Sequence, residues 1–167
     1  MKQIHKGKWS AEIDGDFVVF LIGARIRPRH PVAWFRDLGG RRGMRYMLDR
    51  LMADPDSGLL GYTMGFPVIV QYWRSFEQLE AFASGGGEVH AQAWQNYWRR
   101  MSSQGHAAGI WHETYLVRAG EYESVYGNMP SIGLGRARGA RLSRATTTAR
   151  ERLRRAAAPV TGRGSPG

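Results

Sequence analysis

The stretch from Ile110 to Val117, IWHETYLV, places an imidazole beside a carboxylate at His112 and Glu113. Such a pair suggests either an acid–base site or a zinc-protease motif. The zinc motif requires a second histidine one helical turn later, and position 116 is Leu. The composition of the stretch predicts a strand instead, in which neighbouring side chains point to opposite faces. The two groups therefore cannot form a direct acid–base pair, and at most one of them lines a given cavity.

A second histidine lies in a segment with helical periodicity. Between Glu88 and Met101, His90, Trp94 and Tyr97 recur at spacings that place them on one broad helical face. This face is either an ordinary core stripe or the wall of a pocket for an aromatic or polycyclic substrate. The residues alone leave both interpretations open.

Arg25 is a charged residue inside the otherwise apolar stretch from Phe17 to Ile26. A charge in such a place needs a partner. Glu113 is one candidate, which would make the pair structural. An anion stabilised during a reaction is the alternative partner.

Apolar periodicity and turn residues predict the elements that must position these groups. Ser75 followed by Gln78 matches a capping box at the start of one helix. The expected elements are, in order, a strand at Phe17 to Ile26, a helix from Pro31 to Ala53, strands at Leu59 to Met64 and Pro67 to Trp73, helices from Phe76 to Phe82 and from Glu88 to Met101, and a strand at Gly109 to Val117. This β-α-β-β-α-β order predicts an α+β fold of the ferredoxin-like type.

The predicted strands carry large side chains on both faces, although the helices of such a unit cover only one. We expect the open face to pack against a second copy, which gives a homodimeric α+β barrel with a cavity near or between the sheets. A monomer whose C-terminal segment covers that face is the alternative.

The overall composition predicts one domain and restricts the chemistry. The 167 residues include no cysteine, which removes disulfides, thiolate catalysis and cysteine-bound metal sites from consideration. No signal-peptide pattern and no run of eighteen apolar residues is visible, so we expect a cytoplasmic protein without a membrane span.

Most of the net charge of +10 lies at the C-terminus: residues from Arg136 onward contain nine Arg and one Glu, whereas the first 135 residues carry 15 basic and 13 acidic groups. We therefore predict a folded domain at 1–135 and a disordered Arg-rich tail at 136–167, with a short helix around Thr148 to Ala157. Such a tail would bind polyanions weakly and without sequence specificity.

Between the last predicted strand and this tail, Tyr122 and Tyr126 precede Asn128, Met129 and Pro130. This pattern indicates an ordered loop, which either closes over the cavity or contacts a partner subunit. We prefer the interface role.

Several separated segments together resemble a known family. They are GDFVVFLIGARI, SGLLGYTMGFPVIVQYWRSFEQLEAFA, HAQAW, GIWHETYLV and GEYESVYGNMPSIGLG, within about Trp9 to Arg136. The resemblance is to the monooxygenase-like family named for an enzyme of fumagillin biosynthesis, in the dimeric α+β barrel group. That group also includes antibiotic-biosynthesis monooxygenases, haem aldoxime dehydratases and ligand-binding modules, so the fold does not settle the activity.

The resemblance implies a cofactor-independent monooxygenase that acts on a hydrophobic small molecule in the barrel cavity. A substrate carbanion or enolate would itself reduce dioxygen, while the protein removes a proton and stabilises negative charge. We expect the His112 side of its strand to line the cavity. The candidate catalytic residues are His112 as first choice of base, His90 as second and Arg25 for the anion, with Trp73, Trp94 and Tyr97 shaping the substrate pocket.

Two other functions fit the same sequence. One is a haem-dependent, dehydratase-like enzyme, in which His112 or His90 would be the axial ligand. The other is a non-catalytic dimeric module that binds a hydrophobic ligand and contacts polyanions through its tail. The visible absorption spectrum of the purified protein separates haem chemistry from cofactor-free chemistry.

Overall fold

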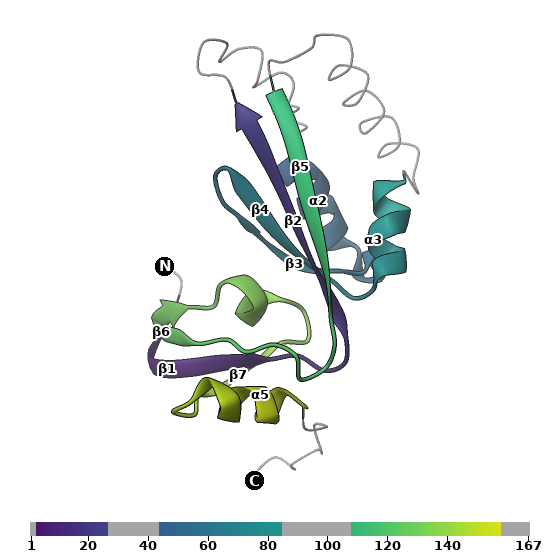
Figure 1. Ribbon diagram of the computed structural model, residues 1–167. Helices are drawn as coiled ribbons and strands as arrows, with labels where there is room; N and C mark the ends of the chain where they lie inside the picture. Colours follow the sequence, from purple (N-terminus) through teal and green to yellow (C-terminus); the bar gives the residue numbers. More distant parts are fainter. Residues whose placement is uncertain (1–2, 27–43, 85–107, 158–167) are drawn as a thin grey trace.

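The computed structural model describes residues 3–26, 44–84 and 108–157, and within these it is a mixed α+β structure with two antiparallel sheets (Figure 1). A four-stranded sheet carries helices on one side. A three-stranded sheet lies at one end of the four-stranded sheet, next to the strand that begins at Phe17. A further helix lies beneath this second sheet.

The four-stranded sheet has the strand order β3-β4-β2-β5, and all neighbours are antiparallel. Along the chain its elements are β2 (Phe17–Ile26), α2 (Met44–Ala53), β3 (Leu59–Met64), β4 (Val68–Trp73), α3 (Phe76–Ala83) and β5 (Ala108–Val117). This confirms the predicted β-α-β-β-α-β order. The predicted helix from Glu88 to Met101, and the first part of the helix predicted from Pro31, lie outside the described residues.

Local side-chain hydrogen bonds fix the ends of these elements. Asp54 caps the short 3-10 helix η2 (Pro55–Ser57) by accepting from the Asp56 amide at 2.9 Å. Ser75 caps α3 by accepting from the Gln78 amide at 3.3 Å, as the capping-box pattern predicts.

The main hydrophobic core lies between this sheet and the two helices. Alternate residues of β2 face the helices, and Trp73 packs on the Phe82 ring with 5.2 Å between ring centroids. The buried members of this core are Val18, Phe20, Ile22, Leu48, Leu59, Trp73 and Leu79. Burial of this much apolar surface is the dominant favourable term for this part of the fold.

The three-stranded sheet has the order β6-β1-β7, with β1 (Ile4–Glu12) between β6 (Tyr126–Pro130) and β7 (Arg141–Arg144). β1 is not among the predicted strands, because its lysines and glycine give no clear alternation. Gly7 has φ +85° where the β1–β6 register shifts, and its amide donates to Asn128 Oδ1 at 2.8 Å. Glycine is suited to such a bulge because it adopts positive φ without steric cost.

The prediction of a disordered tail from Arg136 is wrong for residues 136–157. The boundary falls inside the 3-10 helix η3 (Gly133–Arg136), β7 pairs with β1, and α5 (Ala149–Ala157) confirms the short helix. A reciprocal pair of 3.3 Å bonds between Thr148 and Glu151 caps α5. Residues 158–167 lie outside the described part of the chain.

Arginine side chains order this segment together with Ala137 and Leu142, which pack in the apolar cluster around Phe17. Arg138 donates to the carbonyl oxygens of Met52 and Asp54, and Arg141 pairs with Asp14 at 3.0 Å. The Arg144 guanidinium lies 4.4 Å from the centre of the Trp9 ring. Composition alone suggested too little burial for order, but these guanidinium groups bind oxygens of the preceding domain. Polyanion binding by the tail stays a prediction.

The face of the four-stranded sheet away from α2 and α3 is only partly covered. At one end the three-stranded sheet and η3 pack against Phe17 and Tyr72, so the C-terminal segment covers part of this open face. Further along, the side chains of Trp111 and Tyr115 remain 41% and 50% exposed. The Trp111 indole lies directly over Gly23, its register partner, where a Cβ would come within 2.5 Å of the ring. None of the helices in the described ranges is long and apolar enough to cross a membrane.

Candidate functional site

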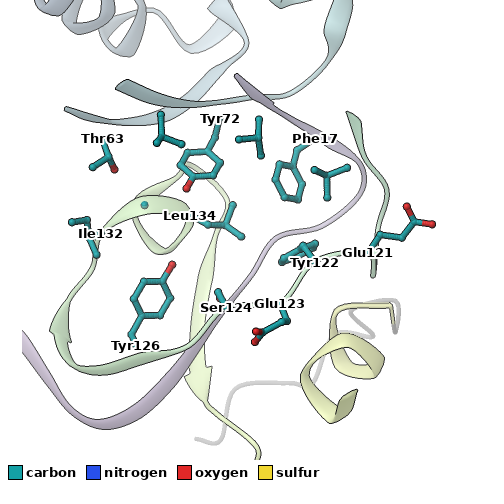
Figure 2. Close-up of a pocket in the computed structure, with 14 residues that line it drawn as sticks. Phe17, Thr63, Tyr72, Glu121, Tyr122, Glu123, Ser124, Tyr126, Ile132 and Leu134 are labelled. Atoms are coloured by element: carbon teal, nitrogen blue, oxygen red, sulfur yellow. The ribbon is translucent and has the colours of Figure 1, made fainter. Parts of the chain in front are cut away.

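A cavity of about 400 Å³ lies between the open face of the four-stranded sheet and the segment from Glu121 to Leu134 (Figure 2). Its volume falls in the range of small-molecule sites, roughly 300–1,000 Å³. The sheet contributes Phe17, Val19, Thr63, Val70, Tyr72 and Val117, and the covering segment contributes Glu121, Tyr122, Glu123, Ser124, Tyr126, Ile132, Gly133 and Leu134. Most of these lining side chains are apolar, and a few of them, such as Tyr72 and Ser124, carry hydroxyl groups.

Side chains of the Glu121–Leu134 covering segment hydrogen-bond to the backbone of β1 and to the backbone of Ile13, which directly follows β1. The Tyr122 hydroxyl accepts from the Ile13 amide at 2.7 Å and donates to the Ile13 carbonyl at 3.0 Å. Ser124 makes the same pair of bonds to the backbone of Ala11, at 2.9 and 3.3 Å. The Tyr122 ring also meets Phe17 edge-on at 5.0 Å. These contacts extend the β1–β6 pairing with side chains and hold one wall of the cavity in place.

Tyr72 and Tyr126 approach each other from opposite walls. Figure 2 shows Tyr72 on the sheet and Tyr126 on the covering segment, with their hydroxyl ends pointing toward one another. The Gly135 amide donates to Tyr126 Oη at 3.0 Å. A Cβ built on Gly133 would lie 3.2 Å from Tyr72 Oη and 4.0 Å from Tyr126 Oη. Both hydroxyl groups therefore border the space beside the Gly133 backbone.

The surroundings of two cavity tyrosines favour their neutral forms. Burial raises the pKa of Tyr72 above 10.0, and Tyr126 adds to this, while a hydrogen bond from the Leu134 backbone opposes it. Burial also raises the pKa of Tyr122, opposed by its bond to Ile13 and assisted by the negative charges of Glu12 and Asp14. Both phenols are hydrogen-bond donors at neutral pH.

Two carboxylates line the outer part of the cavity. Glu123 pairs with Arg152 of α5 at 2.7 Å, and the Arg152 side chain is only 11% exposed. Arg152 also donates to the Thr146 carbonyl at 2.9 Å, so α5 is tied to the covering segment. Glu121 has no ion pair among the described residues, and its carboxylate points away from the tyrosine pair in Figure 2.

The structure places the two predicted catalytic residues that it describes, His112 and Arg25, on opposite faces of the four-stranded sheet. His112 pairs in register with Ile22, a core residue, so it lies on the helix side of the sheet, where it is exposed and its ring lies 5.5 Å from Phe20. The expectation that the His112 side faces the open side of the sheet is therefore wrong. The open side of β5 carries Glu113 and Tyr115, joined by a 2.6 Å hydrogen bond. A catalytic role for His112 stays a prediction.

The other predicted site residues are also separate from the cavity or outside the description. Trp73 is fully buried in the helix-side core, and its Nε1 donates to Gln71 Oε1 at 3.0 Å. Arg25 is on the open face opposite Gly109, whereas Glu113 lies opposite Leu21, so the proposed ion pair does not form. His90, Trp94 and Tyr97 lie outside the described residues.

The sequence pattern predicts a subunit-interface role for Tyr122 and Tyr126 and no role for Tyr72. The useful signal was parity: in the strand VIVQYW, Tyr72 points away from Trp73. Once Trp73 is recognised as core, Tyr72 must lie on the open face. The contribution of η3 had no comparable signal in the sequence.

Comparison with known proteins places the chain in a family. The family model described as monooxygenase af470-like matches residues 17–134, which is more than half of the chain. The chain belongs to the monooxygenase af470-like family. Every residue lining the cavity falls within the range that the family model matches, whereas β7 and α5 lie beyond it.

A relative in the same family is the protein named monooxygenase af470 of Aspergillus fumigatus. The two are 30% identical over 135 residues, which is 73% of this chain and 46% of the relative. The chain thus spans less than half the length of that relative, so family membership is shared but the whole relative's activity is not thereby transferred.

The cavity's residue types indicate what it can do chemically. Apolar walls bind a hydrophobic molecule, and hydroxyl donors orient an oxygen atom of that molecule. Within the described ranges no group of three His, Asp or Glu side chains is placed to hold a metal ion. Of the predicted haem ligands, His112 lies on the opposite side of the sheet from the cavity, and His90 lies outside the description.

Proposed function

We propose that this protein is a monooxygenase-type oxidoreductase that oxidises a hydrophobic, enolisable small molecule bound between the sheet and the Glu121–Leu134 segment. The main support is a largely apolar cavity of about 400 Å³, all of whose lining residues lie in the range that the family model matches. The family description supports the reaction class, and the lining supports the substrate class.

The proposed reaction uses dioxygen as the only oxidant. A substrate CH₂ group beside a carbonyl loses a proton and becomes an enolate, which transfers one electron to dioxygen. The substrate radical and superoxide combine to a carbon-bound peroxide, which is protonated and then loses water to leave a second carbonyl. One oxygen atom enters the product and the other leaves as water, so the step needs no further reductant.

The protein's contributions are substrate positioning, proton removal and stabilisation of the enolate oxygen. Apolar side chains from β2 and β4 would hold the body of the substrate. Glu121 is the candidate proton acceptor among the lining carboxylates, because Glu123 is already paired with Arg152 and Glu121 has no ion pair among the described residues; its side chain, which points away from the tyrosine pair, must turn inward to reach the substrate CH₂ group. Its place at the outer part of the cavity suits proton exchange with solvent.

We also propose that the active form is a homodimer through the uncovered part of the open face, which gives the α+β barrel. Exposed Trp111 and Tyr115 sit there beside partly buried Leu21 and Val68, while α2 and α3 occupy the other side. Sedimentation should show that Trp111→Glu shifts the protein toward monomer. Leu116→Glu, at an exposed position on the helix side of the same strand, should leave the mass unchanged. The reverse pattern would contradict this interface.

A second location for the same reaction is the helix side of the sheet near His112. The specific observation is that Gln71 Nε2, fully buried on that side, has no hydrogen-bond partner among the described residues, while the His112 imidazole is exposed on the same side. An unpaired buried donor and an accessible base are features of a binding site. The experiment must therefore distinguish the two sides of the sheet.

Oxygen consumption by the purified protein, measured with a panel of enolisable aromatic ketones, tests the function and its location together. Val70→Trp fills the cavity and should lower kcat/KM for the active ketone by about tenfold or more. Val125→Trp is the matched control, because Val125 is exposed on the covering segment, does not line the cavity and lies outside the proposed dimer interface.

His112→Ala reports on the other side of the sheet. Normal oxygen consumption in this variant, with loss in Val70→Trp, is the expected result. Loss in His112→Ala with a normal Val70→Trp rate would move the site to the helix side. If the wild-type protein consumes no oxygen with any ketone but binding protects it from thermal unfolding, the protein is a non-catalytic ligand-binding module instead.

A further inference from the structure

We propose that Tyr72 and Tyr126 together bind one oxygen atom of the ligand, a carbonyl or enolate oxygen, through two converging hydrogen bonds. This inference rests on the proposed location of the site, but it does not depend on the oxygenase reaction. It narrows the ligand to an apolar ketone or enol rather than a hydrocarbon or an amine.

The two hydroxyl groups converge because of the backbone at Gly133. This residue has φ +58°, and a side chain there would reach into the space beside both phenols, 3.2 Å from Tyr72 Oη and 4.0 Å from Tyr126 Oη. The two distances place the hydroxyl oxygens within reach of one shared small group. Glycine keeps that space open and permits the positive φ.

The phenol oxygen of Tyr126 is already used as an acceptor, which leaves its proton for a ligand. The Gly135 amide donates to Tyr126 Oη at 3.0 Å. Within the described residues neither hydroxyl donates to a protein acceptor. A tyrosine hydroxyl carries one proton to donate. The pair therefore offers two unused donors at one end of the cavity.

The rest of the cavity determines what carries the accepting oxygen. Val19 and Val70 on the sheet, with Ile132 and Leu134 opposite, provide an apolar wall beside the phenol pair. Partly desolvated donors stabilise a charge that develops on a bound oxygen more strongly than water-exposed ones do. A ketone that becomes an enolate meets both requirements, because it is neutral on entry and gains charge where the donors are. A protonated amine would present only donors to these donors.

Tetralone and tetralin test this inference directly, because they share one carbon skeleton and differ only in the carbonyl group. Titration calorimetry on the full chain should show that the wild type binds tetralone about tenfold or more tightly than tetralin. Tyr72→Phe and Tyr126→Phe should each reduce this preference several-fold, since a single hydrogen bond contributes about 0.5–1.5 kcal/mol. The double variant should bind the two compounds equally.

Tyr62→Phe is the matched control, because the Tyr62 hydroxyl donates to Asp49 and its ring packs on the helix-side core. This variant should keep the wild-type preference. The carbonyl stretching band of bound tetralone supplies a second readout: it should lie at lower frequency in the wild type than in the double variant, which a purely structural role of the tyrosines would not produce.

Equal binding of tetralone and tetralin by the wild type, no binding of tetralone, or a carbonyl preference that survives in the double variant would overturn the inference. The proposed oxygenase function fails separately. A carbonyl preference without oxygen consumption leaves this site intact and removes the reaction, whereas oxygen consumption that is unchanged in the double variant shows that the substrate oxygen is bound elsewhere.

Discussion

The two sides of the four-stranded sheet are built by different means. On the helix side, Trp73, Leu48 and Leu59 are fully or almost fully buried, and apolar packing holds α2 and α3 in place. On the open side, a smaller apolar cluster around Phe17 and Leu134 is combined with hydroxyl-to-backbone bonds from Tyr122 and Ser124, which hold the covering segment. The helix side therefore contributes the larger apolar core, whereas the open side keeps a cavity that is lined in part by polar groups.

This difference has an energetic consequence. Close apolar packing leaves little room for a ligand, since interiors fill space to the density of organic crystals. Hydrogen bonds and ion pairs hold a wall at a distance without filling the space behind it. The Arg152–Glu123 pair and the Tyr122 bonds act in this way, and we therefore expect substitutions on the two sides to affect different properties.

The largest expected effect is on the helix side. Trp73→Ala removes a fully buried indole and its bond to Gln71, and should lower the free energy of unfolding by about 3–5 kcal/mol. Urea denaturation followed by circular dichroism measures this loss. Tyr72→Phe, one residue earlier on the opposite face, should cost only about 1 kcal/mol. Equal losses at the two positions would remove the distinction between the sides.

A smaller effect is expected where α5 holds the covering segment. Arg152→Ala breaks its pair with Glu123 and should cost about 1–2 kcal/mol, because charged hydrogen bonds exceed neutral ones but Glu123 is partly exposed. Hydrogen exchange should become faster at α5 and at residues 122–126. Arg150→Ala, at an exposed position of the same helix, is the control and should exchange at wild-type rates. Unchanged protection in Arg152→Ala would show that α5 does not support this wall.

The smallest expected effect is a pH dependence. Because folding raises the pKa of Tyr72 above 10.0, its stabilising contribution is complete below pH 10 and is lost as the pH rises through the folded value. Tyr72→Phe should therefore show a shallower loss of stability above about pH 10 than the wild type, measured by thermal unfolding across that range. Parallel curves would indicate that the Tyr72 phenol is not shielded in the folded cavity.

The helix-side half of the fold could be predicted from sequence, and the open side could not. Apolar runs at β2 and β4, the turn at Asp54 to Gly58 and the Ser75 cap are local signals. By contrast, β1 is central in its sheet only because β6 and β7, more than a hundred residues away, pair with it. Pairing between polar strands that are far apart in the sequence produces no local hydrophobic periodicity from which the strands could be predicted.

The candidate site shows the same limit. Alternation correctly placed His112 and Glu113 on opposite faces, but it could not say which face the helices cover, and the choice of the His112 side as the open one was wrong. The cavity depends on Tyr126 and Gly133 returning to the sheet from a later segment. The ordered tail was missed because guanidinium contacts to distant oxygens, such as Arg138 to the Asp54 carbonyl, do not register as hydrophobic burial.

Amide chemical-shift mapping with tetralone tests the central claim, that the open side of the sheet holds the ligand site. The Gly135 amide, which donates to Tyr126 Oη at 3.0 Å, is a direct reporter. Saturable shifts at Gly135, Tyr126 and Val70, with His112 and Phe20 unaffected, are the predicted result. Chemical-shift changes that cluster around His112 and Phe20, with the Gly135 amide resonance unchanged, would contradict the account.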